Sequence, residues 1–189
     1  MLIEADKSFF LFLNGFHSPF FDNVMWIITS ASTWYVLYAA MIVWFGFRYK
    51  RFAPVVILFA AVSVALSDLT SVYLFKEVFC RLRPSHNPEF NGIVHIINDY
   101  RGGAYGFVSS HAANGFAVAV FTLLVFRRKW YTVAILFWAC LVSYSRIYVG
   151  VHYPADLAGG AIVGSVIAVL MYVLLKKLKE KFSISDHSS

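Results

Sequence analysis

The chain has 189 residues, of which 60% are hydrophobic, 19% are aromatic and only 14% are charged. A soluble domain of this length carries about 25% charged residues, and the apolar residues here gather in long runs, so the composition indicates a protein of the lipid bilayer. The net charge of +6 lies in short basic clusters between these runs and not in a stripe with a reading motif, which argues against nucleic-acid binding.

The first 32 residues are predicted to lie at the membrane surface. They are apolar, but polar and helix-breaking residues interrupt them at Asn14-Gly15, Ser18-Pro19 and Asp22. We therefore expect one or two amphipathic helices in the interface, or an additional span if residues 19–32 insert. The N-terminus lacks the basic and apolar regions of a cleaved signal peptide.

Apolar segments that are predicted to cross the membrane follow. About 20 mainly apolar residues suffice to cross the hydrocarbon as a helix. We expect an all-α fold, a polytopic helical transmembrane bundle of five to six spans with N-terminal interfacial helices. The predicted organisation is an interfacial region (1–32), a transmembrane domain (33–175) and a cytoplasmic basic tail (176–189). The predicted spans are residues 34–47, 53–75, 110–126, 131–148 and 155–175.

Three basic clusters determine the predicted orientation. With these spans, all three fall on one side of the membrane, and short basic loops stay in the cytoplasm. The outer side then carries positive charge that topology does not require, which indicates a functional role. The clusters are Arg48/Lys50/Arg51, Arg127/Arg128/Lys129 and Lys176/Lys177/Lys179/Lys181, and the outer cations are Lys76, Arg81, Arg83, Arg101 and Arg146.

Three sequence blocks border the outer ends of the predicted spans. Residues 76–84 read KEVFCRLRP, residues 108–111 read VSSH, and residues 145–156 read SRIYVGVHYPAD. Because every block reaches the membrane surface on the same side, their polar side chains are expected to meet in one pocket.

The residue types in these blocks predict an anion site. Lys76, Arg83 and Arg146 supply cations, and guanidinium forks match phosphate oxygens bidentately. Ser109 stands at the N-cap position of one span, and Pro154 suits the first turn of the last span. Two helix N-termini would therefore point unpaired N–H groups at the pocket, and phosphate is the usual guest of such a site.

Two histidines add reactive groups to the predicted pocket. His152 and Asp156 are four residues apart, a spacing that lets the carboxylate orient the imidazole. His111 belongs to the second block. Histidines beside a bound phosphoryl group indicate acid–base or nucleophilic chemistry.

The pattern K-x6-R-P, Ser-x-His and S-R-x5-H-x3-D resembles that of the type 2 phosphatidic acid phosphatases, relatives of the vanadium haloperoxidases. The motifs cover residues 76–156, and the flanking spans extend the likeness to about residues 33–175. The second block of that family usually reads Pro-Ser-Gly-His, and Val108 and Ser110 replace its Pro and Gly here.

This resemblance implies a phosphatase in a helical membrane bundle that uses neither a metal nor a cofactor. It implies that His152 forms a phosphohistidine, that Asp156 holds the His152 ring, and that His111 protonates the leaving group and later helps to activate water. The phosphoryl ligands that it implies are Lys76, Arg83, Ser109 and Arg146. Ser110, in place of the family glycine, is expected to bring its side chain close to the phosphate, and Arg101 in the loop at 85–105 is an additional candidate.

Other polar residues have less specific interpretations. Arg81 is interpreted as an interfacial charge, and Asp68, within a span, suits a structural role as well as a functional one. The spacing of His86, His95 and Asp99 fits no regular metal site, so these residues are expected in a solvated loop.

The sequence therefore predicts an integral membrane lipid phosphate or pyrophosphate phosphatase. We expect it in the bacterial inner (cytoplasmic) membrane with its active site on the periplasmic or exterior face. Undecaprenyl pyrophosphate is the first-choice substrate because an outward site suits recycling of an isoprenoid carrier. Phosphatidylglycerophosphate, phosphatidic acid and lipid A phosphates are the alternatives.

A different class of function is a non-catalytic phospholipid-binding or anion transport protein. Such a protein would need the cations but not the pair of His152 and Asp156 or the second histidine, His111. The expected partners are the lipid phosphate substrate and membrane lipids, with no nucleic acid. The sequence gives no indication of oligomeric state.

Overall fold

The structure is a computed structural model that describes residues 2–181. No β-strand occurs in this range, which confirms the all-α class. Short 3-10 turns lie at Ala31–Trp34, Lys50–Phe52, Pro84–His86 and Pro88–Phe90, and a π-helical segment occupies Thr70–Lys76. The α-helices are α1 (Leu2–Asn14), α2 (Pro19–Thr29), α3 (Tyr35–Tyr49), α4 (Ala53–Leu69), α5 (Glu77–Phe79), α6 (Ser110–Phe126), α7 (Lys129–Tyr148) and α8 (Pro154–Lys181).

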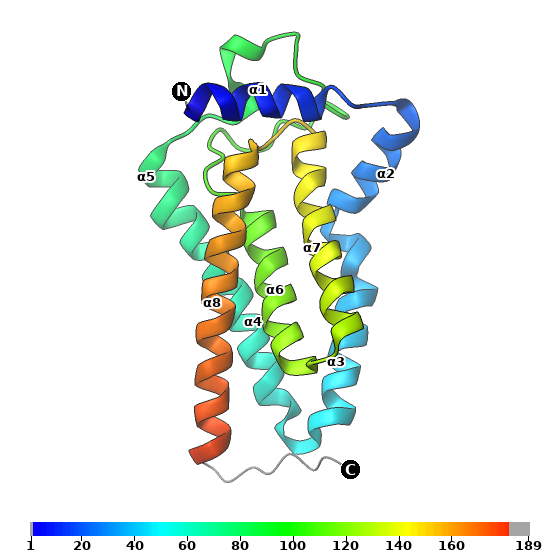
Figure 1. Cartoon of the computed structure of the whole chain (residues 1–189), viewed down its shortest axis with the longest axis vertical. Coiled ribbons are helices and arrows are strands. Elements are labelled where there is room, and N and C mark those ends of the chain that lie inside the picture. The colour runs from blue at the N-terminus through cyan, green and yellow to red at the C-terminus, as the bar shows by residue number, and fades with distance from the viewer. Residues whose placement is uncertain (1, 182–189) are drawn as a thin grey trace.

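The helices form a membrane-spanning bundle. Ala31–Phe79, Lys129–Tyr148 and Pro154–Lys181 are long and apolar enough to cross a membrane, and Ser110–Phe126 is a shorter apolar helix. The first stretch turns back at Lys50, where φ is 47° and a 3-10 turn joins α3 to α4. Within residues 2–181, the helices that run along the long axis of the bundle are therefore α3, α4 with the segment Thr70–Phe79 that continues it, α6, α7 and α8 (Figure 1).

The two N-terminal helices differ in position. α1 lies across one end of the bundle, as an interfacial helix would, whereas α2 runs beside α7 and leads through Ala31–Trp34 into α3 (Figure 1). α1 therefore has the transverse position of an interfacial helix, and α2 does not. Ser18 caps α2 by accepting from the N–H of Phe21 at 3.4 Å, and Pro19 occupies its first turn.

α6 is the central helix, and α8 packs against it with almost no space between the backbones. A Cβ atom at Gly164 would lie 2.0 Å from the carbonyl oxygen of Ala113, and one at Gly160 would lie 2.4 Å from that of Ser109. Small residues four apart allow this approach between membrane helices. The contact places the N-termini of α6 and α8 side by side, where Ser109 N–H donates to the Asp156 carbonyl at 3.0 Å.

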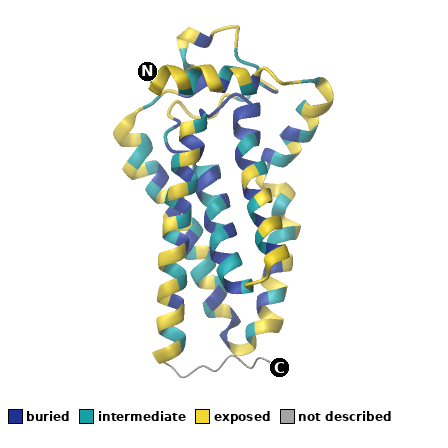
Figure 2. Cartoon of the chain, in the orientation of Figure 1, coloured by how far each residue is buried: buried dark blue, intermediate teal, exposed yellow. Residues whose placement is uncertain are grey.

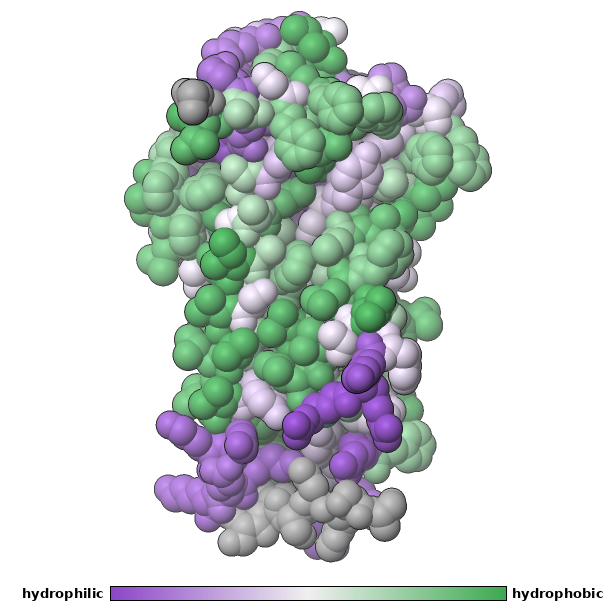
Figure 3. Space-filling view, viewed as in Figure 1, coloured by the Kyte–Doolittle hydropathy of each residue, from purple (hydrophilic) through white to green (hydrophobic). Residues whose placement is uncertain are grey.

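The molecular surface has the distribution expected in a bilayer. An apolar belt covers the middle of the bundle, and polar residues gather at the end opposite α1 (Figure 3). The outward faces of the long helices are exposed (Figure 2). Exposed side chains such as Val133, Ile162 and Leu170 would be a liability in water, so lipid is their natural solvent.

The polar end contains the three predicted basic clusters. They lie at the α3–α4 turn, at the α6–α7 turn and in the last turns of α8, which is helical to Lys181. The first six residues of the predicted tail thus continue α8, and residues 182–189 lie outside the described range.

Candidate active site

The first sequence block begins where α4 continues through the π-helical segment Thr70–Lys76. π-Helical insertions often occur at functional sites, where they rotate a side chain out of the α-helical register. Lys76 ends this segment, and its Nζ donates to the Ser110 Oγ at 2.6 Å. The side chain of Ser110, at the position of the usual family glycine, thus contacts the first cation of the site.

The loop after α5 folds back on itself and holds Arg83. Leu82 and Tyr105 form an isolated antiparallel bridge, and the backbone N–H of Arg83 donates to the Ala104 carbonyl at 3.0 Å. The guanidinium is buried, with Nε donating to the Tyr105 carbonyl at 3.1 Å and Nη1 lying 3.1 Å from the Nε2 of His152. This closed loop therefore places Arg83 directly against the imidazole.

His152 and Asp156 are both fully buried at the start of α8. The Nδ1 of His152 lies 3.3 Å from the Oδ2 of Asp156, which also accepts from the backbone N–H of Tyr153 at 3.0 Å. Because Arg83 has only donors, Nε2 must be the unprotonated nitrogen, and Nδ1 then carries the proton that faces Asp156. The Nε2 lone pair points to the cationic side of the pocket, as a nucleophile requires.

Arg146 approaches the site from the last turn of α7. It is buried, its Nη1 donates to the Thr29 Oγ1 at 2.6 Å, and its Nη2 donates to the Tyr100 hydroxyl at 3.2 Å. Its Nε has no hydrogen-bond partner among the described residues. Both named partners are neutral, so the charge of this guanidinium is not compensated by them.

α6 brings the second block to the same place. Ser109 caps this helix, as predicted, by accepting from the N–H of Ala112 at 3.4 Å. His111, in the first turn, is within electrostatic range of Arg146, His152, Arg83 and Lys76. The structure thus brings together the residues of all three blocks that the sequence had singled out.

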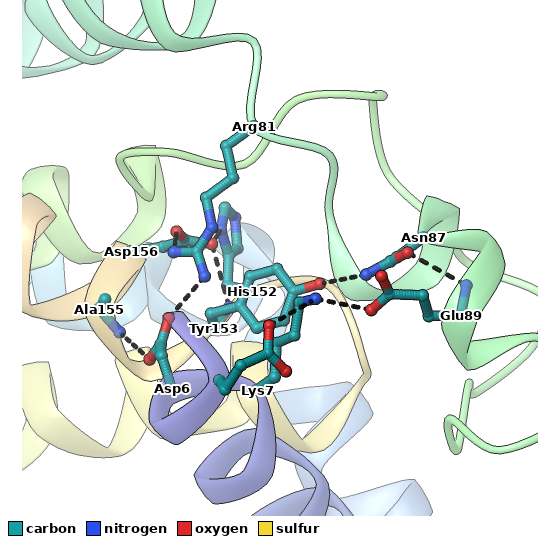
Figure 4. Close-up of polar contacts among 10 residues, drawn as sticks. Asp6, Lys7, Arg81, Asn87, Glu89, His152, Tyr153, Ala155 and Asp156 are labelled. Carbon is teal, nitrogen blue, oxygen red and sulfur yellow. Dashed lines mark hydrogen bonds and ion pairs between the residues drawn. The ribbon is translucent and has the colours of Figure 1, made fainter. Parts of the chain in front are cut away.

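Figure 4 shows a contribution from α1 that the sequence did not reveal. Arg81 joins two carboxylates, with Nη1 donating to Asp156 Oδ1 at 2.8 Å and Nη2 donating to Asp6 Oδ2 at 2.6 Å. Asp6 also accepts from the N–H of Ala155 at 2.9 Å, and the guanidinium of Arg81 lies 4.1 Å from the ring centre of Tyr153. The interpretation of Arg81 as a simple interfacial charge is therefore wrong, because its side chain is turned inward to Asp156.

The electrostatic balance of the pocket is unusual. Among residues 2–181, Lys76, Arg83 and Arg146 form no ion pair. The carboxylate of Asp156, which faces the His152 imidazole, is paired with Arg81. Buried charges without counter-charges are costly. The pocket is therefore built to be completed by an anion.

The same surroundings determine the protonation of the nucleophile candidate. Burial first, and then the nearby cations of Arg83 and Arg146, hold the pKa of the His152 imidazole well below its ordinary value. The backbone of Gly106 opposes this shift by hydrogen bonding to the ring. A Cβ at Gly106 would lie 3.0 Å from Asp156 Oδ2 and 3.1 Å from the Arg83 Cγ, so a side chain there would require these neighbours to shift.

Two other predicted residues lie differently. Arg101 is exposed, and its Nη1 donates to the Ser85 carbonyl at 2.9 Å, so the structure shows it bracing the loop. Asp68 accepts from the Asn114 Nδ2 at 3.2 Å, which gives this intramembrane carboxylate the partner that the sequence did not reveal. Within residues 2–181, no three His, Cys, Asp or Glu side chains gather to hold a metal ion.

Comparisons with known proteins show the family of the chain. The sequence pattern of the PAP2 superfamily matches residues 55–180. The chain belongs to this family. It is a PAP2 membrane lipid phosphatase, and hence a hydrolase, of a bacterial membrane.

Individual PAP2 proteins resemble the chain over most of its length. The lipid A 4'-phosphatases of Bacteroides thetaiotaomicron and Porphyromonas gingivalis are 39% and 38% identical to it, covering 94% and 90% of this chain and 80% and 73% of their own lengths. The undecaprenyl-diphosphatase of Sulfolobus acidocaldarius is 31% identical over 65% of this chain and 55% of its own length. The crystal structure of Aquifex aeolicus LpxE shares the fold, with a TM-score of 0.67, 21% identity and coverage of 87% of this chain and 93% of that one.

Proposed function

We propose that this PAP2 protein hydrolyses a phosphate monoester of lipid A through a phosphohistidine at His152, without a metal. The observation that carries the proposal is the set of uncompensated cations around the Nε2 of His152. A phosphoryl group would supply the missing negative charge and would lie where the lone pair of Nε2 can reach it.

In the first step the Arg83 Nη1–H turns from His152 Nε2 to a phosphoryl oxygen of the bound substrate. Nε2 then attacks phosphorus, which forms the N–P bond as the P–O bond to the lipid breaks. Asp156 stabilises the positive charge that develops on the imidazole, because it faces the Nδ1–H. Lys76, Arg83 and Arg146 neutralise the equatorial oxygens, and the backbone N–H groups of Ser110 and His111, in the first turn of α6, serve the same purpose.

The leaving oxygen needs a proton, and His111 is the candidate donor. It lies on α6, across the pocket from the α8 pair, and it interacts electrostatically with His152. In the second step the same imidazole accepts a proton from the water that attacks the phosphohistidine, so phosphate leaves and Nε2 is restored.

The lipid part of the substrate has a suitable place beside the site. A cavity of about 650 Å³ lies between α3, α4, α6 and α7, with mainly apolar walls that include Trp34, Phe45 and Trp138. His111 and Asn114 line the same cavity. An acyl chain in it would bring an attached phosphate to His111.

The choice of lipid rests on the relatives. Both lipid A 4'-phosphatases align with nearly all of this chain, which favours a lipid A phosphate over undecaprenyl pyrophosphate, the first choice from the sequence alone. We also propose that the bundle is in the inner membrane with its α1 end on the periplasmic face. The three basic clusters at the opposite end support this orientation.

The proposal is tested by phosphate release from purified protein in detergent with EDTA present. Lipid A, undecaprenyl pyrophosphate, phosphatidylglycerophosphate and phosphatidic acid are compared as substrates, each with His152→Ala as the control. We expect release from lipid A at the highest kcat/KM, unaffected by the chelator and lost in the variant.

Each other outcome corrects a separate part of the proposal. Preference for another lipid would replace the substrate and leave the chemistry in place. Release that EDTA abolishes, or that His152→Ala leaves unchanged, would contradict the mechanism.

A further inference from the structure

A second cavity, of about 790 Å³, lies at the end of the bundle opposite the candidate active site. It is bounded by the end of α3, the α6–α7 turn and the last turns of α8. Among the described residues that line it, five are cationic and none is acidic. The cations are Arg48, Arg127, Arg128, Lys176 and Lys179.

Two of the residues that line this cavity, Trp44 and Phe126, belong to a stack of aromatic rings. The rings of Trp44 and Phe126 lie 3.6 Å apart at an interplanar angle of 14°, and Phe126 continues the stack onto Tyr131 at 4.1 Å and 6°. The Nζ of Lys179 lies 4.9 Å from the centre of the Tyr49 ring. The cavity thus combines aromatic faces with a cationic rim.

The position of the cavity identifies the kind of molecule that fits it. It lies where the apolar belt of the bundle meets the basic end (Figure 3), which is the level of lipid head groups. Trp130 lines it and is 71% exposed, as an aromatic residue of the membrane interface would be. An occupant there has its chains beside the apolar belt and its phosphate among the cations.

We propose that this cavity binds the phosphate head group of an anionic phospholipid from the leaflet at the basic end. Basic pockets between membrane helices hold such head groups through their charge, and each Lys or Arg near the surface strengthens the attraction. This site is separate from the phosphatase site, and it does not depend on the substrate proposed above.

Topology alone would also place basic residues at this end, and the structure allows the two roles to be separated. Lys50 and Arg51 are exposed in the α3–α4 turn and are not among the residues that line the cavity. Removing these two charges lowers the charge of the same end as much as removing Arg127 and Arg128, which do line it.

The experiment is native mass spectrometry of the full chain in detergent, titrated with dioleoyl phosphatidylglycerol or dioleoyl phosphatidylcholine. Arg127→Gln/Arg128→Gln is compared with Lys50→Gln/Arg51→Gln, both in an Arg83→Gln background so that phosphate binding at the active site is weakened throughout. The same double variants with Arg83 intact are assayed for phosphatase activity in detergent, which reports whether they fold.

We expect phosphatidylglycerol to bind at least about tenfold more tightly than phosphatidylcholine. The cavity variant should lose about tenfold or more of this affinity, whereas the turn variant should stay within about threefold of the parent. Equal weakening by both variants, or binding of the two lipids with equal affinity, would overturn the proposal. So would a failure of phosphatidylglycerol to bind the parent protein.

Discussion

The carboxylate of Asp156 receives donors on both of its oxygens, and these contacts orient the ring that is proposed to attack phosphorus. Arg81 holds Oδ1, while the backbone N–H of Tyr153 and the His152 Nδ1 share Oδ2. Arg81 is in turn held by Asp6 on α1. Asp6 is thus a positioning residue that acts through Arg81, and it is 149 positions away from Ala155, the other residue that it contacts.

Replacing Asp6 with Asn tests this arrangement. The loss of one carboxylate from Arg81 should leave its guanidinium free to turn, so Asp156 holds the imidazole less firmly in the transition state. We expect kcat to fall about tenfold, equivalent to about 1.4 kcal/mol, with KM within about twofold of the wild type. Steady-state kinetics on the preferred lipid measure both constants.

Lys7 provides the matched control on the same helix. Its Nζ pairs with Glu89 at 2.6 Å and with Glu4 at 3.2 Å, so it also anchors α1 but does not contact Arg81. Lys7→Gln should therefore leave kcat near that of the wild type. An equal loss in both variants would mean that α1 matters only as a whole, and Asp6→Glu should restore much of the rate if the carboxylate is what matters.

The pH profile gives a second prediction at this scale. His152 must be neutral to attack, and its pKa is held well below the ordinary value, so the neutral form persists as the pH falls. The acid limb of kcat/KM should accordingly lie below pH 6.5. Removing the adjacent cation in Arg83→Gln should raise the His152 pKa and move the limb upward, but only in part because burial is the larger cause.

The substrate's own ionisation is common to all variants, so the difference between their limbs reports the enzyme. Arg51→Gln, which removes an exposed charge at the far end, is the control and should leave the limb in place. A limb that stays fixed in Arg83→Gln, or that moves downward, would show that His152 is not the group that titrates.

Sequence spacing predicted some residues of the site and not others, for a physical reason. Some of the residues lie in three sequence blocks whose order and internal spacing are typical of the family. These are Lys76, Arg83, Ser109, His111, Arg146, His152 and Asp156. Asp6, Thr29 and Tyr100 join the site through long-range contacts, which leave no periodicity or spacing in the sequence. Arg81 was misread because only the tertiary structure shows that its side chain turns inward.

Among the helices, the α6–α8 contact determines how the reactive groups meet. The Cβ position at Gly164 overlaps the Ala113 carbonyl, so any side chain there forces the two helices apart. Gly164→Ala should therefore destabilise the protein by about 2 kcal/mol or more and should lower activity, because His111 and His152 lie on opposite sides of this contact. Thermal unfolding in detergent measures the loss.

Gly46 on α3 is the matched control because nothing lies within 4 Å of its Cβ position. Alanine is the better helix former by about 1 kcal/mol, so Gly46→Ala should be neutral or slightly stabilising. If Gly164→Ala proved as stable as Gly46→Ala, the close packing of α6 on α8 would be contradicted.

Hydropathy predicted the long helices well and the short ones poorly. Residues 110–126 and 131–148 nearly coincide with α6 and α7 because apolar length is the dominant signal for a span. The course of α2 and the closed loop before α6 depend on tertiary contacts such as the bond from Arg146 to Thr29. These contacts have no counterpart in local composition.

Taken as a whole, the molecule has two charged ends with different chemistry. At the α1 end, buried and half-buried cations surround an imidazole, and among the described residues Lys76, Arg83 and Arg146 form no ion pair. At the opposite end, exposed cations rim an aromatic cavity. The first arrangement suits a phosphoryl group that reacts, and the second suits one that only binds.

The central claim is that His152 is phosphorylated during turnover, and the most direct test is to trap that species. Protein mixed with lipid labelled with ³²P in its phosphate is quenched in alkali within the first turnover, digested and mapped by mass spectrometry. We predict label on His152 that is stable in alkali and lost in acid, with none in His152→Ala. Label on another residue, or full turnover with no labelled protein at any time, would contradict the account.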